Sequence, residues 1–172
     1  MDSPACRDAG PADAARLATL GRDSFTETFG HLYSPENLAA FLSGHSESGW
    51  RAELGDPRFA VRIAQVGGRP VAYAKLGPPS LPFEVSGPSI ELRQFYVLAA
   101  WHGSGIAAEL MAWVLAESRR RGAEQLFLSV FVDNRRARRF YERYGFDYVG
   151  KYHFMVGSHA DDDLIMRLRL DP

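Results

Sequence analysis

The sequence predicts one mixed α/β domain with a parallel crossover near its middle. Three observations support this fold class. The chain has 172 residues, the size of a single domain, and 46% are hydrophobic, so a core can form without disulfides. Helical periodicity dominates the first third of the chain, and strand patterns begin near residue 59. Two later helical segments, 105–122 and 134–144, separate the strands that follow.

Three helices are expected before the first strand. Residues 8–29 carry an apolar stripe at helical spacing, with Pro11 in the first turn. Ser34 and Pro35 fit the N-cap and first position of a second helix. Residues 46–54 form a third, short helix in this interpretation.

The strands follow from alternation and from turn residues. Gly67-Gly68 is a hairpin turn signal, and the Pro/Gly-rich residues 77–88 predict a loop. Residues 125–132 form a nearly continuous apolar run, typical of a central strand. The predicted strands are 59–66, 71–76, 90–98, 125–132, 145–152 and 164–170.

Composition and charge exclude several classes of protein. Twenty basic and 21 acidic residues leave a net charge of −1, which argues against nucleic-acid binding. The single cysteine excludes an intramolecular disulfide. Five scattered histidines show no metal-ligand spacing, so we expect no metal site. No signal peptide or membrane span is visible, and we expect a cytoplasmic protein.

The segment 97–107 joins a strand end to a helix start and places Gly103 and Gly105 at the turn. Open N–H groups there and at the first helical turn would form an anion cradle suited to a pyrophosphate. The segment is neither a Walker A loop nor a dinucleotide fingerprint. A second motif follows at residues 134–146, which read N-x-x-A-x-x-F-Y-E-x-x-G-F.

With these two motifs, residues 59–170 resemble the GNAT N-acetyltransferase superfamily. The resemblance implies a mostly antiparallel sheet, splayed in the middle and flanked by helices, and acetyl-CoA as cosubstrate. His102 stands where the family usually has Arg or Gln, and Ala99 where a proline often precedes the loop. The residues that the resemblance assigns to cofactor binding are Phe95, Tyr96, Val97, His102, Gly103, Ser104, Gly105, Ile106, Ala107, Asn134, Ala137 and Tyr141.

The same resemblance supplies candidate catalytic residues. Tyr141 matches the family tyrosine that protonates the leaving thiolate. Glu91 is the first candidate for the general base and Glu84 the second. The alternatives are that Glu91 is an exposed edge carboxylate paired with Arg93 and that Glu84 is a solvated loop residue. One or two arginines of the run 135–143 are expected at the adenosine phosphate, and the others on a solvated helix face.

The ends of the chain are similar to the spermidine (polyamine) N-acetyltransferase branch, at residues 25–38 and 154–166. This predicts a primary amine acceptor in a groove lined by Glu27, Glu36 and Glu84. A protein N-terminus, an amino acid or an antibiotic is the alternative acceptor, and a non-catalytic acyl-CoA sensor is the alternative of another class. The predicted domain spans 1–172, with acceptor-side helices in 1–58 and the acetyl-CoA core in 59–172; a homodimer is possible.

Overall fold

The structure is a computed structural model that describes residues 2–171. A seven-stranded sheet has the order β1-β2-β3-β4-β5-β7-β6. Its strands are β1 (Ala5–Asp8), β2 (Ala60–Val66), β3 (Arg69–Gly77), β4 (Ser89–Val97), β5 (Gln125–Phe131), β6 (Asp147–Val156) and β7 (His159–Arg169). The helices are α1 (Ala14–Phe29), α2 (Pro35–Leu42), α3 (Glu47–Leu54), α4 (Ile106–Arg120) and α5 (Arg135–Arg143), with short 3₁₀ turns at Pro11–Asp13, Gly30–Leu32 and Ala99–Trp101.

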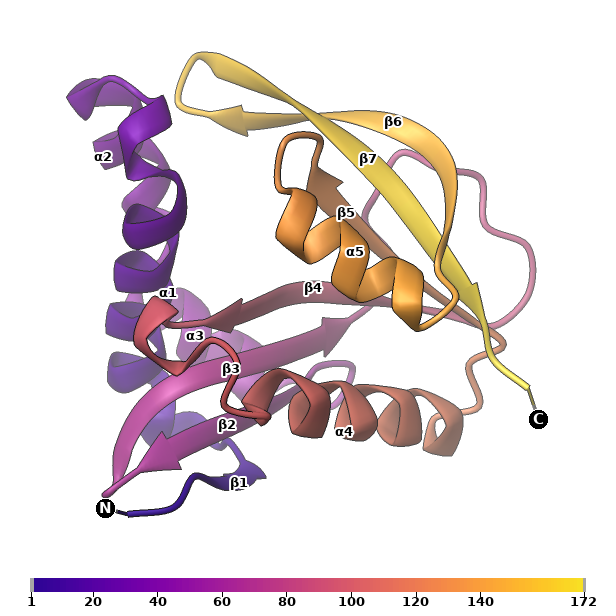
Figure 1. Ribbon diagram of the computed structural model, residues 1–172, viewed down its shortest axis with the longest axis horizontal. Coiled ribbons are helices and arrows are strands. Elements are labelled where there is room, and N and C mark those ends of the chain that lie inside the picture. The colour runs from indigo at the N-terminus through magenta and orange to yellow at the C-terminus, as the bar shows by residue number, and fades with distance from the viewer. Residues whose placement is uncertain (1, 172) are drawn as a thin grey trace.

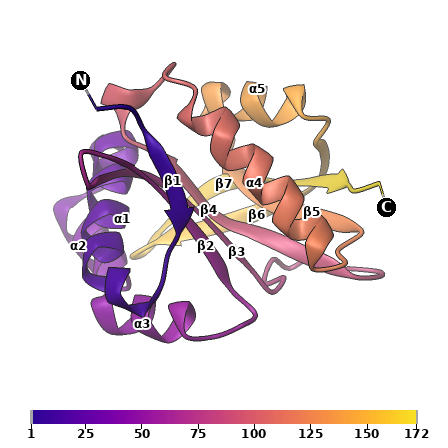
Figure 2. The same ribbon diagram turned by 90° about the horizontal axis from the view of Figure 1, so that it is seen from below.

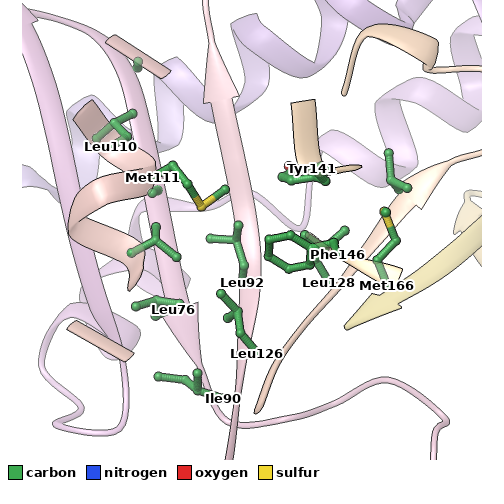
Figure 3. Close-up of a cluster of buried hydrophobic side chains, with 14 of the residues drawn as sticks. Leu76, Ile90, Leu92, Leu110, Met111, Leu126, Leu128, Tyr141, Phe146 and Met166 are labelled. Carbon is green, nitrogen blue, oxygen red and sulfur yellow. The ribbon is translucent and has the colours of Figure 1, made fainter. Parts of the chain in front are cut away.

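Helices cover both faces of this sheet (Figures 1 and 2). α4 and α5 lie on one face, over a core that includes Leu110, Met111 and Leu128 (Figure 3). α1 and α3 lie on the other face, where Leu17 and Trp50 pack with strand residues of a second core. The strands alternate between the two cores, as the side-chain period of two requires.

The sheet splits in its middle. β4 and β5 form its parallel pair, and their register covers only Ser89–Glu91 against Gln125–Phe127. Beyond these residues the two strands continue without pairing to each other, which leaves two facing strand edges. A register shift in β4 places Arg93 in a bulge opposite the Lys75/Leu76 step of β3, and bulges bend a strand and increase its twist.

The N-terminal segment differs from the expected helix. Ala5–Asp8 form an edge strand antiparallel to β2, and the α-helix begins only at Ala14. Pro11 instead begins a 3₁₀ turn closed by Asp13, whose carboxylate accepts from the N–H of Gly10 at 2.9 Å. Residues 1–58 therefore contribute a strand to the sheet as well as helices. No helix within residues 2–171 is long and apolar enough to cross a membrane.

The C-terminal hairpin is longer than its apolar pattern predicts. The pairing of β6 with β7 begins where Asp147 lies opposite Arg167. It ends where Val156 lies opposite His159, next to the turn at Gly157. Ser158 N–H donates to the side-chain oxygen of Asn37 on α2 at 2.9 Å, which fastens the hairpin tip to this helix. Figure 1 shows this tip next to α2, across the gap between the sheet halves.

Candidate active site

A cleft of about 480 Å³ occupies the split between β4 and β5. Its walls are residues 92–97 of β4 and 128–131 of β5, and it continues along α5 to the N-terminus of α4. On the other face of the sheet it reaches α1 and β7. The cleft therefore passes through the sheet and joins two separate surfaces of the molecule.

One end of the cleft lies at the glycine-containing turn into α4. Gly103 (φ 76°) and Gly105 (φ 92°) hold left-handed backbone conformations that turn the chain into α4. The first N–H groups of α4 have no helical partner, and Ala107 and Ala108 line the cleft at this point. Because the helix dipole adds positive potential here, the predicted pyrophosphate cradle fits the observed backbone.

Three residues at this turn, His102, Ser104 and Ile106, make contacts within the protein. The ring of His102 lies 2.9 Å from the carbonyl oxygen of Val97 through Nε2 and braces the loop against the end of β4. Ser104 donates its hydroxyl to the carbonyl of Trp101 at 2.6 Å. Ile106 is 1% exposed, so its side chain belongs to the core and only its N–H can serve the predicted role.

The arginines of α5 divide into two groups by their position relative to the cleft. Arg136 and Arg143 line the cleft. Arg138 is occupied elsewhere, because it donates to the carbonyl of Val132 at 2.7 Å and to the hydroxyl of Tyr148 at 3.0 Å. The predicted contact of one or two arginines with the adenosine phosphate stays a prediction, and Arg136 and Arg143 are its candidates.

The backbone of β4 presents donors to the cleft. The N–H of Leu98 donates to the carbonyl of Val71 on β3 at 3.0 Å. This bond shows which residues of β4 direct their N–H groups to β3. In an antiparallel pair, every second residue directs its N–H away from the partner strand. The N–H groups of Phe95 and Val97 therefore point to the cleft, whereas that of Tyr96 points to β3, and the side chain of Tyr96 lines the cleft instead.

The motif of residues 134–146 places its polar groups at the cleft. Asn134 caps α5, because its side-chain oxygen accepts from the N–H of Ala137 at 3.3 Å, and its amide NH₂ remains available. Tyr141 is 7% exposed and packs edge-on against Phe146 at 5.6 Å between ring centroids (Figure 3). Burial raises the pKa of the Tyr141 phenol, so the group stays protonated at neutral pH.

Glu91 has a different place from the one expected of a general base. It lies where β4 and β5 are still paired, opposite Phe127, and it does not line the cleft. Its carboxylate accepts from the N–H groups of Ser80 (2.8 Å) and Leu81 (3.2 Å) and lies 3.3 Å from Arg93. Glu91 therefore anchors the loop that precedes β4. The alternative is right about the pairing with Arg93 and wrong about exposure, because Glu91 is buried on a central strand.

The other predicted carboxylates also lie outside the cleft. Glu84 is an exposed residue of the loop after β3. Glu27 accepts from the N–H of Ala99 at 2.9 Å and ties α1 to the turn after β4. Glu36 is exposed in the first turn of α2. The cleft includes none of these three residues, so the predicted acidic groove is not formed by them.

The acidic residues in the cleft are Asp161 and Asp163 of β7. They are 6% and 7% exposed, and alternation directs both to the face that α1 and α2 cover. The hydroxyl of Tyr33 donates to Asp161. Burial, with a further contribution from Asp161, raises the pKa of Asp163 to about 7. Aromatic rings complete this wall: Phe25, Phe29, Phe131 and Phe154.

The sequence holds one signal for this acidic wall. Residues 161–163 are three aspartates directly before an alternating apolar run. Extending that alternation backwards puts Asp161 and Asp163 in phase with Ile165, which is fully buried. The apolar run alone predicts a strand that begins only at residue 164. With that start, Asp161 and Asp163 would precede the strand, and nothing in the sequence would indicate that they line a cleft.

A second cavity of about 430 Å³ lies between α2, α3 and the hairpin tip. Its charged groups already satisfy each other, because Lys75 Nζ lies 3.0 Å from Glu53 and 4.5 Å from the ring centre of Trp50. Gln94 borders both cavities and accepts from the hydroxyl of Tyr73 at 2.7 Å. It is a separate cavity that adjoins the main cleft at Gln94.

Known proteins share this arrangement. Residues 17–146 match the acetyltransferase (GNAT) family. An uncharacterised N-acetyltransferase of Mycobacterium tuberculosis is 36% identical over 155 residues, or 90% of this chain and 96% of that protein. The aminoalkylphosphonate N-acetyltransferase of Salmonella typhimurium is 33% identical over 100 residues, or 57% of this chain and 63% of that protein.

A solved structure gives the same fold. The PaiA N-acetyltransferase of Thermoplasma acidophilum, in complex with coenzyme A, matches with a TM-score of 0.76 at 17% identity, over 97% of this chain and 99% of that one. The fold and the family match place the chain among the acetyltransferases. The chain belongs to the GNAT family of N-acetyltransferases, and acetyl-CoA is its cosubstrate.

Proposed function

We propose that this enzyme transfers the acetyl group of acetyl-CoA directly to a primary amine within a ternary complex. The single observation that carries the proposal is the continuous cleft, which joins the anion cradle on one face of the sheet to the acidic and aromatic wall on the other. Two substrates entering from opposite faces would meet between β4 and β5. Such a meeting needs no covalent enzyme intermediate.

In this proposal the cosubstrate end is held mainly by backbone groups. The N–H groups of Gly103, Gly105, Ala107 and Ala108 and the guanidinium groups of Arg136 and Arg143 bind the phosphates. The amide of Asn134 orients the pantetheine arm. The N–H groups of Phe95 and Val97 face the thioester and stabilise the oxyanion that forms there, and one such donor typically contributes about 2.7–4 kcal/mol.

Tyr141 is the proposed acid for the departing thiolate. Its hydroxyl makes no hydrogen bond within residues 2–171, and the residue lines the cleft. A raised pKa keeps the phenol neutral, so it can donate to sulfur when negative charge develops there.

The acceptor is proposed to be a small aliphatic amine, and a polyamine such as spermidine is one member of that class. The buried Asp161 and Asp163 support a cationic substrate. Glu27, Glu36 and Glu84 are not proposed as acceptor ligands, because they lie outside the cleft. The amino groups of proteins and amino acids remain the comparison substrates.

The test is thiol release from acetyl-CoA with a panel of amines that includes spermidine. We expect acetyl-CoA to raise the melting temperature and at least one primary amine to give turnover. Binding of acetyl-CoA without turnover on the whole panel would favour a sensor, and the absence of any thermal shift at millimolar acetyl-CoA would remove the proposal.

Tyr141→Phe tests the acid. Because a positioned general acid contributes about 10²–10⁴-fold, we expect kcat to fall by roughly that factor while the Kd for acetyl-CoA stays near the wild-type value. Tyr144→Phe is the matched control at the end of the same helix, since Tyr144 does not line the cleft. Equal rates for the two variants would assign Tyr141 to the core alone.

A further inference from the structure

The acceptor face of the cleft contains a buried carboxylate, Asp163, that forms no ion pair within residues 2–171. Asp163 lies on β7, with Phe131 of β5 as its neighbour on one side and Tyr152 of β6 on the other. It is 7% exposed, and it lines the same cleft as Tyr141 and the inward-facing backbone of β4. A buried carboxylate that borders a substrate cleft is available to a substrate.

Its neighbours on β7 differ from it in their partners. Asp161 accepts from the hydroxyl of Tyr33 and lies 3.1 Å from Nε2 of His159. Asp162 points to the opposite face, where its side chain is 78% exposed and lies 3.4 Å from His153. Asp163 forms no ion pair within residues 2–171, although a buried charge ordinarily has one.

The surroundings of Asp163 favour a proton on it. Burial is the main cause that raises its pKa to about 7, Asp161 and Asp162 add to the rise, and the hydroxyl of Ser129 opposes it. A cation that enters the cleft would restore the ionised form. The titratable groups that face Asp163 from the packed elements are Tyr96 of β4, Tyr33 before α2, Tyr152 of β6, and Asp161 and His159 of β7.

We propose that Asp163 is the general base that takes the proton of the acceptor amine, and that the acidic wall selects amines with no anionic group beside the reactive nitrogen. The inference rests on the proposed function and assigns its base and its acceptor class. It replaces Glu91, which the fold uses to hold the loop before β4.

Protons and electron pairs balance across the transfer. An ammonium acceptor gives one proton to the carboxylate of Asp163, and the freed nitrogen lone pair forms the C–N bond to the thioester carbonyl. The C–S bond then breaks, and Tyr141 protonates the departing sulfur. The second proton of the nitrogen, acidic once the C–N bond exists, returns through water to Tyr141. Asp163 passes its proton to solvent, so each turnover releases one proton.

The acceptor class follows from charge and shape. Asp161 and Asp163 would repel a carboxylate or phosphonate held next to the amine, because both are buried where water screens poorly. The rings of Phe29, Phe131 and Phe154 offer apolar surface beside them. An alkyl or arylalkyl chain that carries an ammonium group fits this wall, as spermidine and phenethylamine do, whereas glycine and aminomethylphosphonate do not.

The experiment measures kcat/KM against pH for Asp163→Asn, Asp161→Asn and the control Asp162→Asn, with spermidine and phenethylamine as acceptors. For the wild type we expect activity to fall as pH decreases through about 7, because only ionised Asp163 accepts a proton. In Asp163→Asn the fall of kcat/KM toward low pH (the acidic limb) should disappear, and kcat/KM should drop by about 10²–10⁴-fold. In Asp161→Asn the limb should move to lower pH, because one repulsive charge is gone.

Asp162→Asn should keep the wild-type rate above pH 7 and move the pH dependence less than Asp161→Asn does, because Asp162 contributes less than Asp161 to the raised pKa of Asp163. The Kd for acetyl-CoA of each variant shows whether it is folded. Wild-type rates in Asp163→Asn, or an unchanged pH limb, would overturn the assignment while leaving the transferase activity intact. Faster turnover of glycine or aminomethylphosphonate than of spermidine and phenethylamine would overturn the acceptor class. A wild-type enzyme that acetylates no amine would remove the proposed function itself.

Discussion

At the scale of single residues, position relative to the split in the sheet decides what a carboxylate does. Glu91 and Asp163 are both buried acids on central strands, at 5% and 7% exposure. Glu91 precedes the point where β4 and β5 separate, and backbone N–H groups of the adjoining loop satisfy it. Asp163 lies beyond that point and borders open space. The same residue chemistry serves structure in one place and is free for reaction in the other.

Glu91→Gln provides a test at this scale. The amide cannot accept as strongly from Ser80 and Leu81, and charge-assisted hydrogen bonds contribute about 1.5–3 kcal/mol. We expect the free energy of unfolding to fall by roughly that amount while kcat changes less than about threefold. Urea unfolding and steady-state rates measure both; a large loss of kcat with unchanged stability would return Glu91 to the catalytic role.

At the scale of elements, the turn into α4 depends on a backbone conformation that only glycine adopts readily. Gly105 has a φ of 92°, and a Cβ placed on it would meet open space, so backbone strain and not steric contact excludes other residues. The hairpin of β6 and β7 is the second decisive element, because its tip is fastened to α2 by Asn37 and carries Asp161 into the cleft.

Gly105→Ala tests the turn. A left-handed conformation costs an L-residue about 1–2 kcal/mol, so we expect the free energy of unfolding to fall by that amount and the KM for acetyl-CoA to rise as the cradle shifts. Gly10→Ala is the control, since Gly10 has a φ of −130° and no atom near an added Cβ. An unchanged KM in Gly105→Ala would mean that this turn does not shape the cosubstrate site.

At the scale of the whole molecule, the enzyme is two half-sheets joined by a short parallel contact. β1 to β4 carry α1, α3 and α4, and β5 to β7 carry α5. The cleft between them exposes strand edges that have no strand partner beyond Glu91 and Phe127. A bound cosubstrate would hydrogen-bond the β4 edge and bridge the halves.

Hydrogen exchange tests this arrangement. We expect acetyl-CoA to slow amide exchange at Phe95 and Val97 on the cleft wall and at Gly103, Gly105, Ala107 and Ala108 at its mouth. The β1–β2 edge should be unchanged. The physical reason is that bound phosphates and pantetheine occupy N–H groups that water otherwise reaches. Protection confined to β1 and β2 would contradict the assigned binding site.

Local patterns account for much of this fold. The Ser34 cap, the glycine turn before α4 and the apolar run of residues 125–132 predicted elements that the structure confirms, the strand ending one residue earlier, at Phe131. The local sequence pattern did not predict β1. Its four residues have no regular apolar alternation, and they form a strand because they pair with the edge of β2. The expected homodimer and cytoplasmic location stay predictions.

The family, the glycine turn before α4 and the helix that carries Tyr141 could all be predicted from the amino-acid order, because they depend on glycine conformations and on short spacings within one turn and one helix. Which acids face the substrate could not be read in this way. Glu91 and Asp163 are 72 residues apart in number (163 − 91), and their roles follow from where β4 and β5 stop pairing. That point is set by strand twist and by the bulge at Arg93, which are long-range properties of the sheet.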